Sequence, residues 1–178
     1  PKGLSHGPFL GHAPSGGATV WARGNLPGEY SLMVWRGDGS ESRVVVARTT
    51  AERDLTLEWE ITELEPGADY QYRIVMDNTL LGAAHDLRAG VADDTKVVHL
   101  AFASCANEKR FPEQPGWARM LQSGAEAIVM LGDMPYIDST ELEVQRRRYR
   151  EFYAHADVKA ALSCLLYTSP SPRDSDQS

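Results

Sequence analysis

The hydrophobic pattern of the chain changes near residue 96, and this change constrains the fold more than any other feature. Up to about His85, apolar and polar residues alternate in short runs separated by turns, as in strands with one buried face. From Val97 on, apolar residues form continuous runs, which are typical of parallel strands covered on both faces. We therefore expect an all-β sandwich at residues 1–88, a polar linker at 89–96 and an α/β domain at 97–162.

The alternation is clearest in two segments, Asp54–Thr62 and Asp69–Met76. In the first, Leu57 and Trp59 fall on one face and glutamates on the other, so one face should be buried. Turn residues such as Pro27-Gly28 separate the runs, and we expect about six or seven strands in all, the usual number for such a sandwich. The earlier strands are expected at Ala18–Arg23, Glu29–Arg36 and Ser42–Ala47.

The turn between the two clearest strands has a recognisable form. The segment Leu64-Glu65-Pro66-Gly67-Ala68-Asp69-Tyr70 resembles the tyrosine corner of fibronectin type III domains, in which the tyrosine hydroxyl bonds to upstream backbone. A plain Pro-Gly turn is the alternative. The resemblance implies a fibronectin III-like sandwich.

The second half predicts a βαβ unit followed by a further helix. Val97–Ala103 and Ala127–Leu131 have the length and composition of buried strands. Between them, Pro115–Ser123 has Trp117 on an apolar stripe and ends before Gly124, a suitable helix terminus. The segment Thr140-Glu141-Leu142-Glu143 has the pattern of a capping box, which predicts the start of the second helix.

The last part of the chain has a different character. Residues 163–178 run into a Ser/Pro-rich polar end that cannot bury a core, so we expect a disordered tail there. The end also resembles the translated adaptor read-through (CLLYTSPSPRDS) found in some assembled transcript sequences. By that interpretation residues 163–178 are non-native and the α/β domain is truncated near Leu162.

Charge and composition exclude several classes of function. The 18 Lys and Arg residues against 25 Asp and Glu residues give a net charge of −7, which argues against broad binding to nucleic acid or to an anionic membrane surface. No apolar run approaches the ~18 residues of a membrane span, and the first residues lack the pattern of a signal peptide. The two cysteines give no disulfide framework. Nothing in the sequence indicates a protein partner or an oligomeric state.

Potential metal ligands follow both predicted α/β strands. Cys105 comes after the first strand, and Asp133 and Tyr136 come after the second. Ligands of α/β sheets bind just beyond the carboxyl ends of the strands, so these side chains should meet there. Thiolate, carboxylate and phenolate together suit a strongly acidic cation. Taken singly, Cys105 could be a small buried hydrophobe, Asp133 a turn cap and Tyr136 a packing residue.

Two stretches carry a specific resemblance. Phe102–Asn107 (FASCAN) and Ile128–Asp138 (IVMLGDMPYID) resemble motifs of the alkaline phosphatase D (PhoD-like) family of metallophosphatases. That family also carries a fibronectin-like β domain before its catalytic domain. The resemblance implies an αββα metallophosphatase domain, hydrolysis of small phosphate esters (monoesters or diesters) and an extracytoplasmic location.

The same resemblance implies roles for individual residues. Cys105 corresponds to the metal-binding thiolate, Asp133 to the metal-bridging catalytic carboxylate and Tyr136 to a tyrosine ligand of iron, with Fe(III) and Ca(II) as the metals. The sequence departs from the family in having no downstream Trp-Asp-Asp-His or Asn-His-Asp/Glu motif. The five histidines show no ligand spacing and do not replace these motifs. We therefore expect half of a site, no activity from this chain alone, and poor solubility or partial folding after residue 96.

Two other functions fit parts of the sequence. A purple acid phosphatase-like hydrolase has a similar Gly-Asp-x-x-Tyr motif but an Asp in place of Cys105, which disfavours it. A non-catalytic β-sandwich binding module would leave Cys105, Asp133 and Tyr136 without a metal. The basic run Arg146-Arg147-Arg148, together with Arg150, could contact phosphate, but the flanking glutamates favour a solvated helix face.

Overall fold

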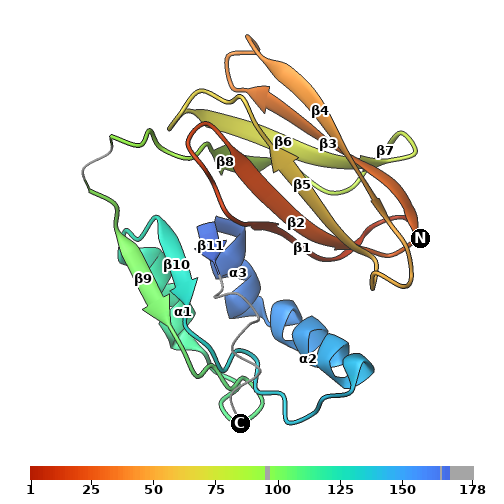
Figure 1. Cartoon of the computed structure of the whole chain (residues 1–178), viewed down its shortest axis with the longest axis vertical. Coiled ribbons are helices and arrows are strands. Elements are labelled where there is room, and N and C mark those ends of the chain that lie inside the picture. The colour runs from red at the N-terminus through yellow and green to blue at the C-terminus, as the bar shows by residue number, and fades with distance from the viewer. Residues whose placement is uncertain (95–96, 165, 169–178) are drawn as a thin grey trace. The chain divides into compact units, whose positions relative to one another are not determined.

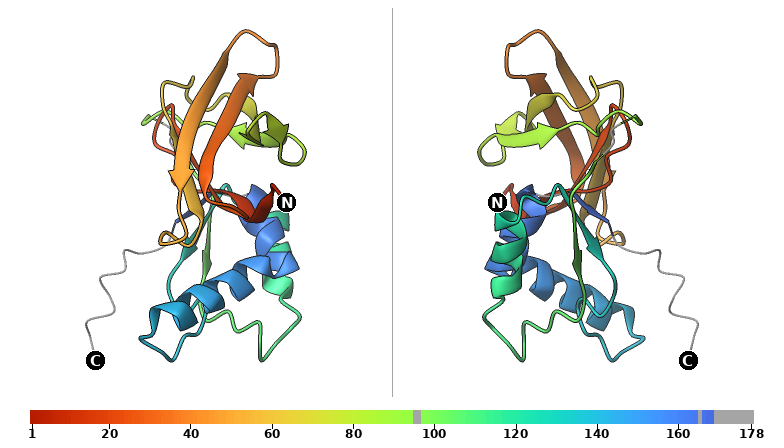
Figure 2. Two further views of the ribbon diagram at one scale, coloured as in Figure 1. Left: turned by 90° about the vertical axis from the view of Figure 1, so that its right-hand side faces the viewer. Right: turned by 90° about the vertical axis from the view of Figure 1, so that its left-hand side faces the viewer.

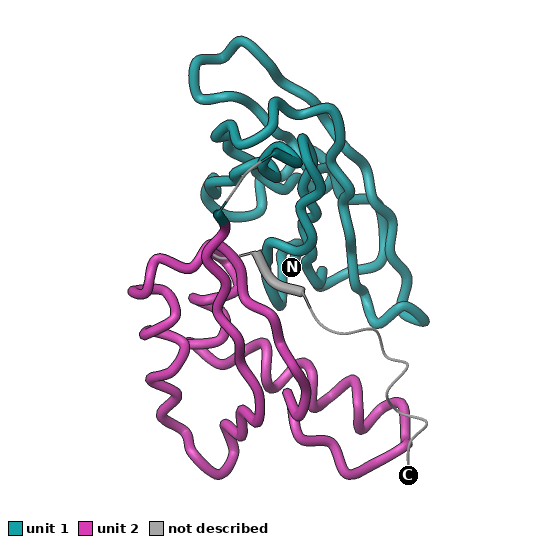
Figure 3. The backbone as a smooth tube through the Cα atoms, turned by 60° about the vertical axis from the view of Figure 1, so that its left-hand side comes forward, with its two compact units in different colours: residues 1–97 teal, residues 98–178 magenta. Residues whose placement is uncertain are grey.

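The computed structural model describes residues 1–94, 97–164 and 166–168, and the chain divides into two units, residues 1–97 and 98–178 (Figure 3). The first unit consists of antiparallel strands, and the second combines short parallel strands with helices (Figure 1). None of the helices in the described part is long and apolar enough to cross a membrane.

The first unit is a β-sandwich of two antiparallel sheets. One sheet has the order β1-β2-β5, and the other has the order β4-β3-β6-β7, with β8 also paired to β6. Figure 2 shows β3 and β4 as a long hairpin. The expected sandwich is confirmed, but its described residues form eight strands where six or seven were expected, and β1, β7 and β8 lie outside the ranges predicted for individual strands. The strands are β1 (Leu4–Leu10), β2 (Ala18–Gly24), β3 (Gly28–Arg36), β4 (Ser42–Thr49), β5 (Thr56–Ile61), β6 (Asp69–Met76), β7 (Thr79–Leu80) and β8 (His85–Arg88).

Alternating side chains from both sheets form the sandwich core. Trp59 on β5 and Tyr72 on β6 are fully buried, although their strands lie in different sheets. The indole Nε1–H of Trp59 donates to the carbonyl oxygen of Tyr30 on β3 at 3.2 Å, which joins the two sheets through a buried hydrogen bond. Burial of such large aromatic groups contributes about 1.5–3 kcal/mol each.

The tyrosine corner is confirmed in its hydrogen bonding. The backbone N–H of Glu65 donates to the Tyr70 hydroxyl at 3.0 Å, so the hydroxyl binds the chain five residues upstream. The same hydroxyl donates to the Glu41 carboxylate at 2.8 Å. Burial of the ring, which is 2% exposed, is the main reason that the pKa of Tyr70 is raised.

The sandwich extends further than the sequence predicted. Leu87 and Ala89 are buried, and Gly90 pairs with Ser15 and donates its N–H to the carbonyl oxygen of Gly17. A Cβ atom at Gly90 would lie 2.1 Å from the Pro14 carbonyl oxygen, so only glycine fits there. The expected linker at 89–96 therefore begins after Gly90, because residues 89 and 90 close the sandwich. Residues 95 and 96 lie outside the described residues.

The second unit is built around a short parallel sheet of order β11-β10-β9. The βαβ unit is confirmed: β9 and β10 are parallel, and α1 connects them. Trp117 on α1 is buried, and its ring lies 6.1 Å from that of Phe152 on α2 in an edge arrangement. The elements are β9 (Leu100–Ala103), α1 (Pro115–Gln122), β10 (Ala127–Met130), α2 (Leu142–Ala154), α3 (Ala156–Cys164) and β11 (Leu166–Thr168).

Only one face of this sheet is covered, which corrects the expectation of strands buried on both faces. Ile128 and Met130 on β10 are buried, and α1 and α3 lie on one side of the sheet (Figure 2). On the other face, Leu100 and Phe102 of β9 are 47% and 62% exposed. The sequence pattern shows that both faces are apolar, but exposure of Leu100 and Phe102 leaves the second face of the sheet open to solvent.

Two further expectations need correction. The helix α2 begins at Leu142, and its N-cap Glu141 makes no side-chain capping bond. Thr140 therefore does not form the expected capping box. The hydroxyl of Ser139 accepts a hydrogen bond from the N–H of Glu141 at 3.1 Å. The tail was expected to be disordered from residue 163, but α3 continues through Cys164 and Leu166–Thr168 pair with β10. β9 pairs with one edge of β10, and Leu166–Thr168 pair with its other edge. Residues 165 and 169–178 lie outside the described residues.

Candidate functional site

The candidate site begins where β9 and β10 end. Beyond the strands, the N–H of Leu131 donates to the Ala103 carbonyl oxygen at 2.8 Å, and the N–H of Cys105 donates to the Gly132 carbonyl oxygen at 3.2 Å. The parallel pairing therefore continues for one step past both strands. This brings Cys105 and Asp133 to the same edge of the sheet although 28 residues separate them.

The backbone at this edge adopts an uncommon conformation. Cys105 has a φ of 58° and Asp133 has a φ of 53°, and both lie in the left-handed region that non-glycine residues seldom adopt. Gly132 between β10 and Asp133 has a φ of 133°, which glycine adopts without a steric penalty. Left-handed residues of this kind cost roughly 1–3 kcal/mol and cluster at functional sites. Here the left-handed residues Cys105 and Asp133 turn the backbone sharply just after β9 and β10.

The three residues expected to bind metal come together at this point. The sulfur of Cys105 lies 3.9 Å from Oδ2 of Asp133. The Tyr136 phenol interacts with the Cys105 side chain, and this interaction is the main reason that the pKa of Tyr136 is raised above its ordinary value. Partial desolvation and the nearby charges of Cys105 and Asp133 add to the increase.

This donor set fits a single metal ion. The thiol, carboxyl and phenol groups each provide an anionic ligand once deprotonated, and a bound cation would favour deprotonation of all three. Without a cation, the negative charge of each group disfavours ionisation of the other two. The raised pKa of Tyr136 has this direction. Carboxylate and phenolate oxygens suit a hard cation such as Fe(III). The Asp133 carboxylate is also a ligand suited to calcium.

The site is open to solvent. Cys105 and Asp133 are exposed, and Tyr136 is 37% exposed. No histidine joins them: among the residues that the structure describes, no group of three or more His, Cys, Asp or Glu side chains could hold a metal ion. Tyr136 is therefore needed to complete the set of three, and one side of the set is left free for further ligands.

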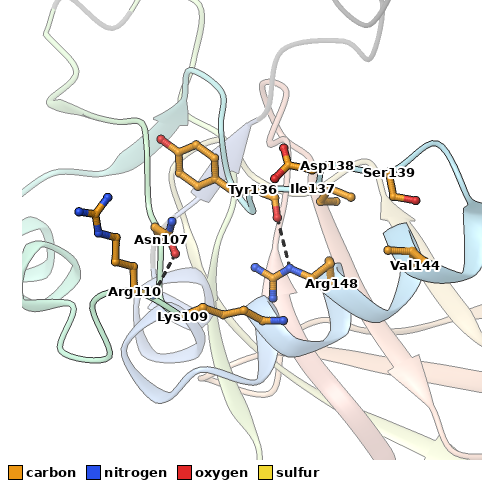
Figure 4. A pocket seen from close by; sticks show the side chains of 9 residues that line it. All are labelled: Asn107, Lys109, Arg110, Tyr136, Ile137, Asp138, Ser139, Val144 and Arg148. Carbon is orange, nitrogen blue, oxygen red and sulfur yellow. Dashed lines mark hydrogen bonds between the residues drawn. The ribbon is translucent and has the colours of Figure 1, made fainter.

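A pocket of about 520 Å³ lies beside Tyr136 (Figure 4). Its walls come from the loops after β9 and β10 and from α2, so it shares these loops with the candidate site. Cationic side chains prevail over the single carboxylate of Asp138. The pocket is lined by Asn107, Lys109, Arg110, Tyr136, Ile137, Asp138, Ser139, Val144 and Arg148.

The sequence did not single out Arg148 as a pocket residue, because the basic run to which it belongs was expected to lie on a solvated helix face. The structure corrects this for Arg148, because its side chain is 8% exposed and its Nη2 lies 2.9 Å from the Glu108 carboxylate. Arg146 and Arg147 pair with Glu143 and Glu151 on the same helix, as a balanced face would. One signal could have identified Arg148: it lies four residues before the buried Phe152, on the same stripe of α2.

Comparison with solved structures shows the fold of the chain. It is similar to PhoD with a TM-score of 0.79 and 17% sequence identity, over 94% of this chain and 38% of that one. The chain thus spans well under half the length of that protein. No protein-family model matches the sequence, and no curated protein matches it.

Two other similarities concern about half of the chain. One is to the sensor domain of the anti-sigma factor RsgI4 from Pseudobacteroides cellulosolvens, with a TM-score of 0.42 and 12% identity over 52% of this chain and 97% of that one. The other is to the chicken CNTN1 FN1-FN3 domains, with a TM-score of 0.36 and 18% identity over 57% of this chain and 37% of that one.

Proposed function

We propose that this chain carries part of the metal site of a PhoD-like metallophosphatase that hydrolyses phosphate monoesters or diesters. The observation that carries the proposal is the convergence of Cys105, Asp133 and Tyr136 at the ends of two parallel strands. The similarity of the fold to PhoD supports it. An extracytoplasmic location belongs to the same proposal and rests on the family resemblance.

Each of the three residues has a role in the proposed site. Cys105 and Tyr136 would hold Fe(III) as thiolate and phenolate, and Asp133 would contribute a carboxylate that can also face a second cation, Ca(II). When bound, the metal ions would supply Lewis-acid polarisation of a phosphoryl group. The protein fixes the ligand directions through the left-handed backbone at Cys105 and Asp133.

Cationic side chains beside the site suit an anionic substrate. Lys109 and Arg110 belong to the loop that follows β9, and both line the pocket next to Tyr136. Lys109 pairs with Glu151 at 2.8 Å, so Arg110 is better placed to meet a phosphate ester. The guanidinium of Arg110 lies over the Phe111 ring, with 5.3 Å between its Cζ and the ring centre. Because this contact uses the face of the guanidinium, its N–H groups can still donate to a phosphate.

We further propose that this chain alone does not turn over phosphate esters. A two-metal mechanism needs ligands on both sides of the metal pair, and the described residues bring together one set of three. Activity therefore has to be tested in a protein that also carries the further metal ligands, with p-nitrophenyl phosphate and bis-p-nitrophenyl phosphate as substrates and with iron and calcium added.

Metal binding tests the proposal on the chain as it stands. The full chain is loaded with ferric nitrilotriacetate, separated from free metal and analysed for iron. We expect about one iron per chain, the capacity of a single three-ligand set, and a large loss in Cys105→Ser, Asp133→Asn and Tyr136→Phe.

The matched controls are Cys164→Ser, Asp138→Asn and Tyr149→Phe. Each makes the same chemical change at a residue outside the set of three, and each should bind iron as the unmodified chain does. Equal iron content in all six variants would contradict the proposed site and would favour the non-catalytic sandwich.

A further inference from the structure

Arg148 joins three segments of the second unit through its guanidinium. Its Nε donates to the backbone carbonyl oxygen of Tyr136 at 3.2 Å (Figure 4). Its Nη2 donates to Glu108 at 2.9 Å, and its Nη1 donates to Glu151 at 2.7 Å. Tyr136 follows β10, Glu108 follows β9, and Glu151 lies on α2, so one side chain links both site loops to the helix.

The arrangement requires an arginine. The side chain of Arg148 is 8% exposed and that of Glu108 is 7% exposed, so both charges are largely withdrawn from water. A buried pair of this kind is tolerated because each charge has a hydrogen-bonded partner. The planar guanidinium donates in three directions at once, whereas a lysine ammonium at the same place has no fixed donor fork.

The contact with Tyr136 is made to its backbone and not to its ring. The phenol hydroxyl is engaged with Cys105, and the carbonyl oxygen of the same residue is engaged with Arg148. A fixed carbonyl restrains the peptide plane that follows Cα, and so limits the movement of Cα, from which the side chain leaves the backbone. Because Tyr136 is 37% exposed, packing encloses its side chain only in part.

We infer that Arg148 is a positioning residue that orients Tyr136 toward Cys105 and Asp133 by holding its backbone carbonyl, and this inference rests on the proposed metal site. Arg148 does not touch the metal. It acts through Tyr136, as groups that orient the ligands of metal sites do. Glu108 and Glu151 hold the guanidinium in place on the side away from Tyr136.

The test uses the full chain and ferric nitrilotriacetate, with the visible absorption band of tyrosinate bound to Fe(III) as the readout. Arg148→Lys keeps the positive charge and removes the donor fork. We expect a weakened or shifted tyrosinate band and an Fe(III) affinity about 10- to 100-fold lower, the usual effect of losing a residue that orients a metal ligand. The matched control is Arg146→Lys on the same helix, which should leave the band unchanged.

A second background separates positioning from general destabilisation. In Tyr136→Phe the tyrosinate band is absent, and iron held by Cys105 and Asp133 alone is weaker. Adding Arg148→Lys to Tyr136→Phe should cause no further loss of affinity, because the residue that Arg148 positions has lost its ligand atom. A purely structural role would lower the affinity by the same factor in both backgrounds, and that result would overturn the inference.

Outcomes for the two proposals are distinguishable. If the unmodified chain shows no iron binding, the proposed metal site fails, and the inference fails with it. If the unmodified chain shows the band and Arg148→Lys shows the same band with the same affinity, the metal site stands and the inference is overturned. If Arg148→Lys loses its helical circular dichroism, Glu108→Gln replaces it in the same cycle, because glutamine keeps an oxygen acceptor for Nη2 while removing the charge that fixes the guanidinium.

Discussion

The sulfur of Cys105 lies 3.9 Å from Oδ2 of Asp133, and both residues have left-handed backbone conformations. Cys105 lies just after β9, and Asp133 lies just after the parallel strand β10. The Cys105 N–H donates to the carbonyl oxygen of Gly132, the residue before Asp133. The backbone therefore holds Cys105 and Asp133 side by side before any ligand binds. Preorganisation of this kind lowers the cost of binding a cation between them.

The first prediction concerns the titration of Tyr136 in the metal-free chain. The interaction with Cys105 raises the pKa of Tyr136, so its phenol should ionise at higher pH than an ordinary tyrosine. Cys105→Ala removes the largest cause and should lower this pKa. The measurement is the NMR shift of tyrosine labelled at Cζ, with Tyr136→Phe used to assign the signal.

The sign of the linkage follows from the same shift. The folded pKa of Tyr136 lies above the unfolded value, so the contribution to stability is fully present below about pH 10 and is lost as the pH rises through the folded pKa. An unchanged titration in Cys105→Ala would contradict the contact between the two side chains.

The second prediction concerns acid. Hydrogen bonds from Lys109 and then Arg148 lower the pKa of Glu151 to about 2. A carboxyl group whose pKa is lower in the folded state than in the unfolded state stabilises the fold at pH values above its unfolded-state pKa, near 4.5. This stabilisation is lost as the pH falls toward 2, the pKa in the folded state. We expect helical circular dichroism to fall over this interval, and to fall less steeply in Glu151→Gln.

Salt provides a check on that prediction. The side chain of Glu151 is 41% exposed, so its ion pairs are screened and the effect should shrink at high ionic strength. Glu143→Gln is the matched control, since Glu143 is 74% exposed and pairs with Arg146 on the same helix. A steep acid transition that is identical in Glu151→Gln would show that other carboxyl groups control it.

The third prediction concerns the tyrosine corner. Tyr70→Phe leaves the Glu65 N–H and the Glu41 carboxylate without their shared partner. We expect a loss of about 1–2 kcal/mol in the free energy of unfolding, the usual cost of removing a partly buried hydrogen-bonding group. Urea unfolding followed by tryptophan fluorescence measures it. Tyr149→Phe, at a tyrosine that is 44% exposed, should change the stability little.

The fourth prediction concerns the open face of the parallel sheet. Leu100 and Phe102 present apolar side chains to solvent on β9, which is the edge strand of this sheet among the described residues. Such surfaces promote association, so the chain should self-associate as its concentration rises. Phe102→Thr should reduce this in sedimentation velocity runs, whereas Val44→Thr on the sandwich should not. A chain that stays monomeric at every concentration would contradict the prediction.

The sequence predicted features that depend on local pattern. The alternation around Trp59 predicted β5, and Trp117 together with Gly124 predicted α1. The meeting of Cys105 with Asp133 was also predictable, because two parallel strands bring their carboxyl ends to one edge. In each case the information lies in residues close in sequence or in a general rule of sheets.

Features that depend on distant partners could not be predicted in this way. Arg148 and Glu108 are 40 residues apart, and nothing in a run of arginines shows which one has a buried partner. The apolar character of Leu100 and Phe102 did not reveal their exposure, because a side chain's hydrophobicity does not show whether another element covers it. The strand β8 was missed because only Leu87 of its four residues is buried.

The closed pairing of the sandwich has a consequence for synthesis on the ribosome. Every strand from β1 to β8 has its partners within the first 88 residues. A domain of this kind can complete its folding while later residues are still in the exit tunnel, because synthesis is slow compared with the folding of one domain. The strand β9 emerges next and must wait for β10, more than 20 residues later, with Leu100 and Phe102 uncovered. A nascent chain at this stage is therefore the one that chaperones should bind most strongly.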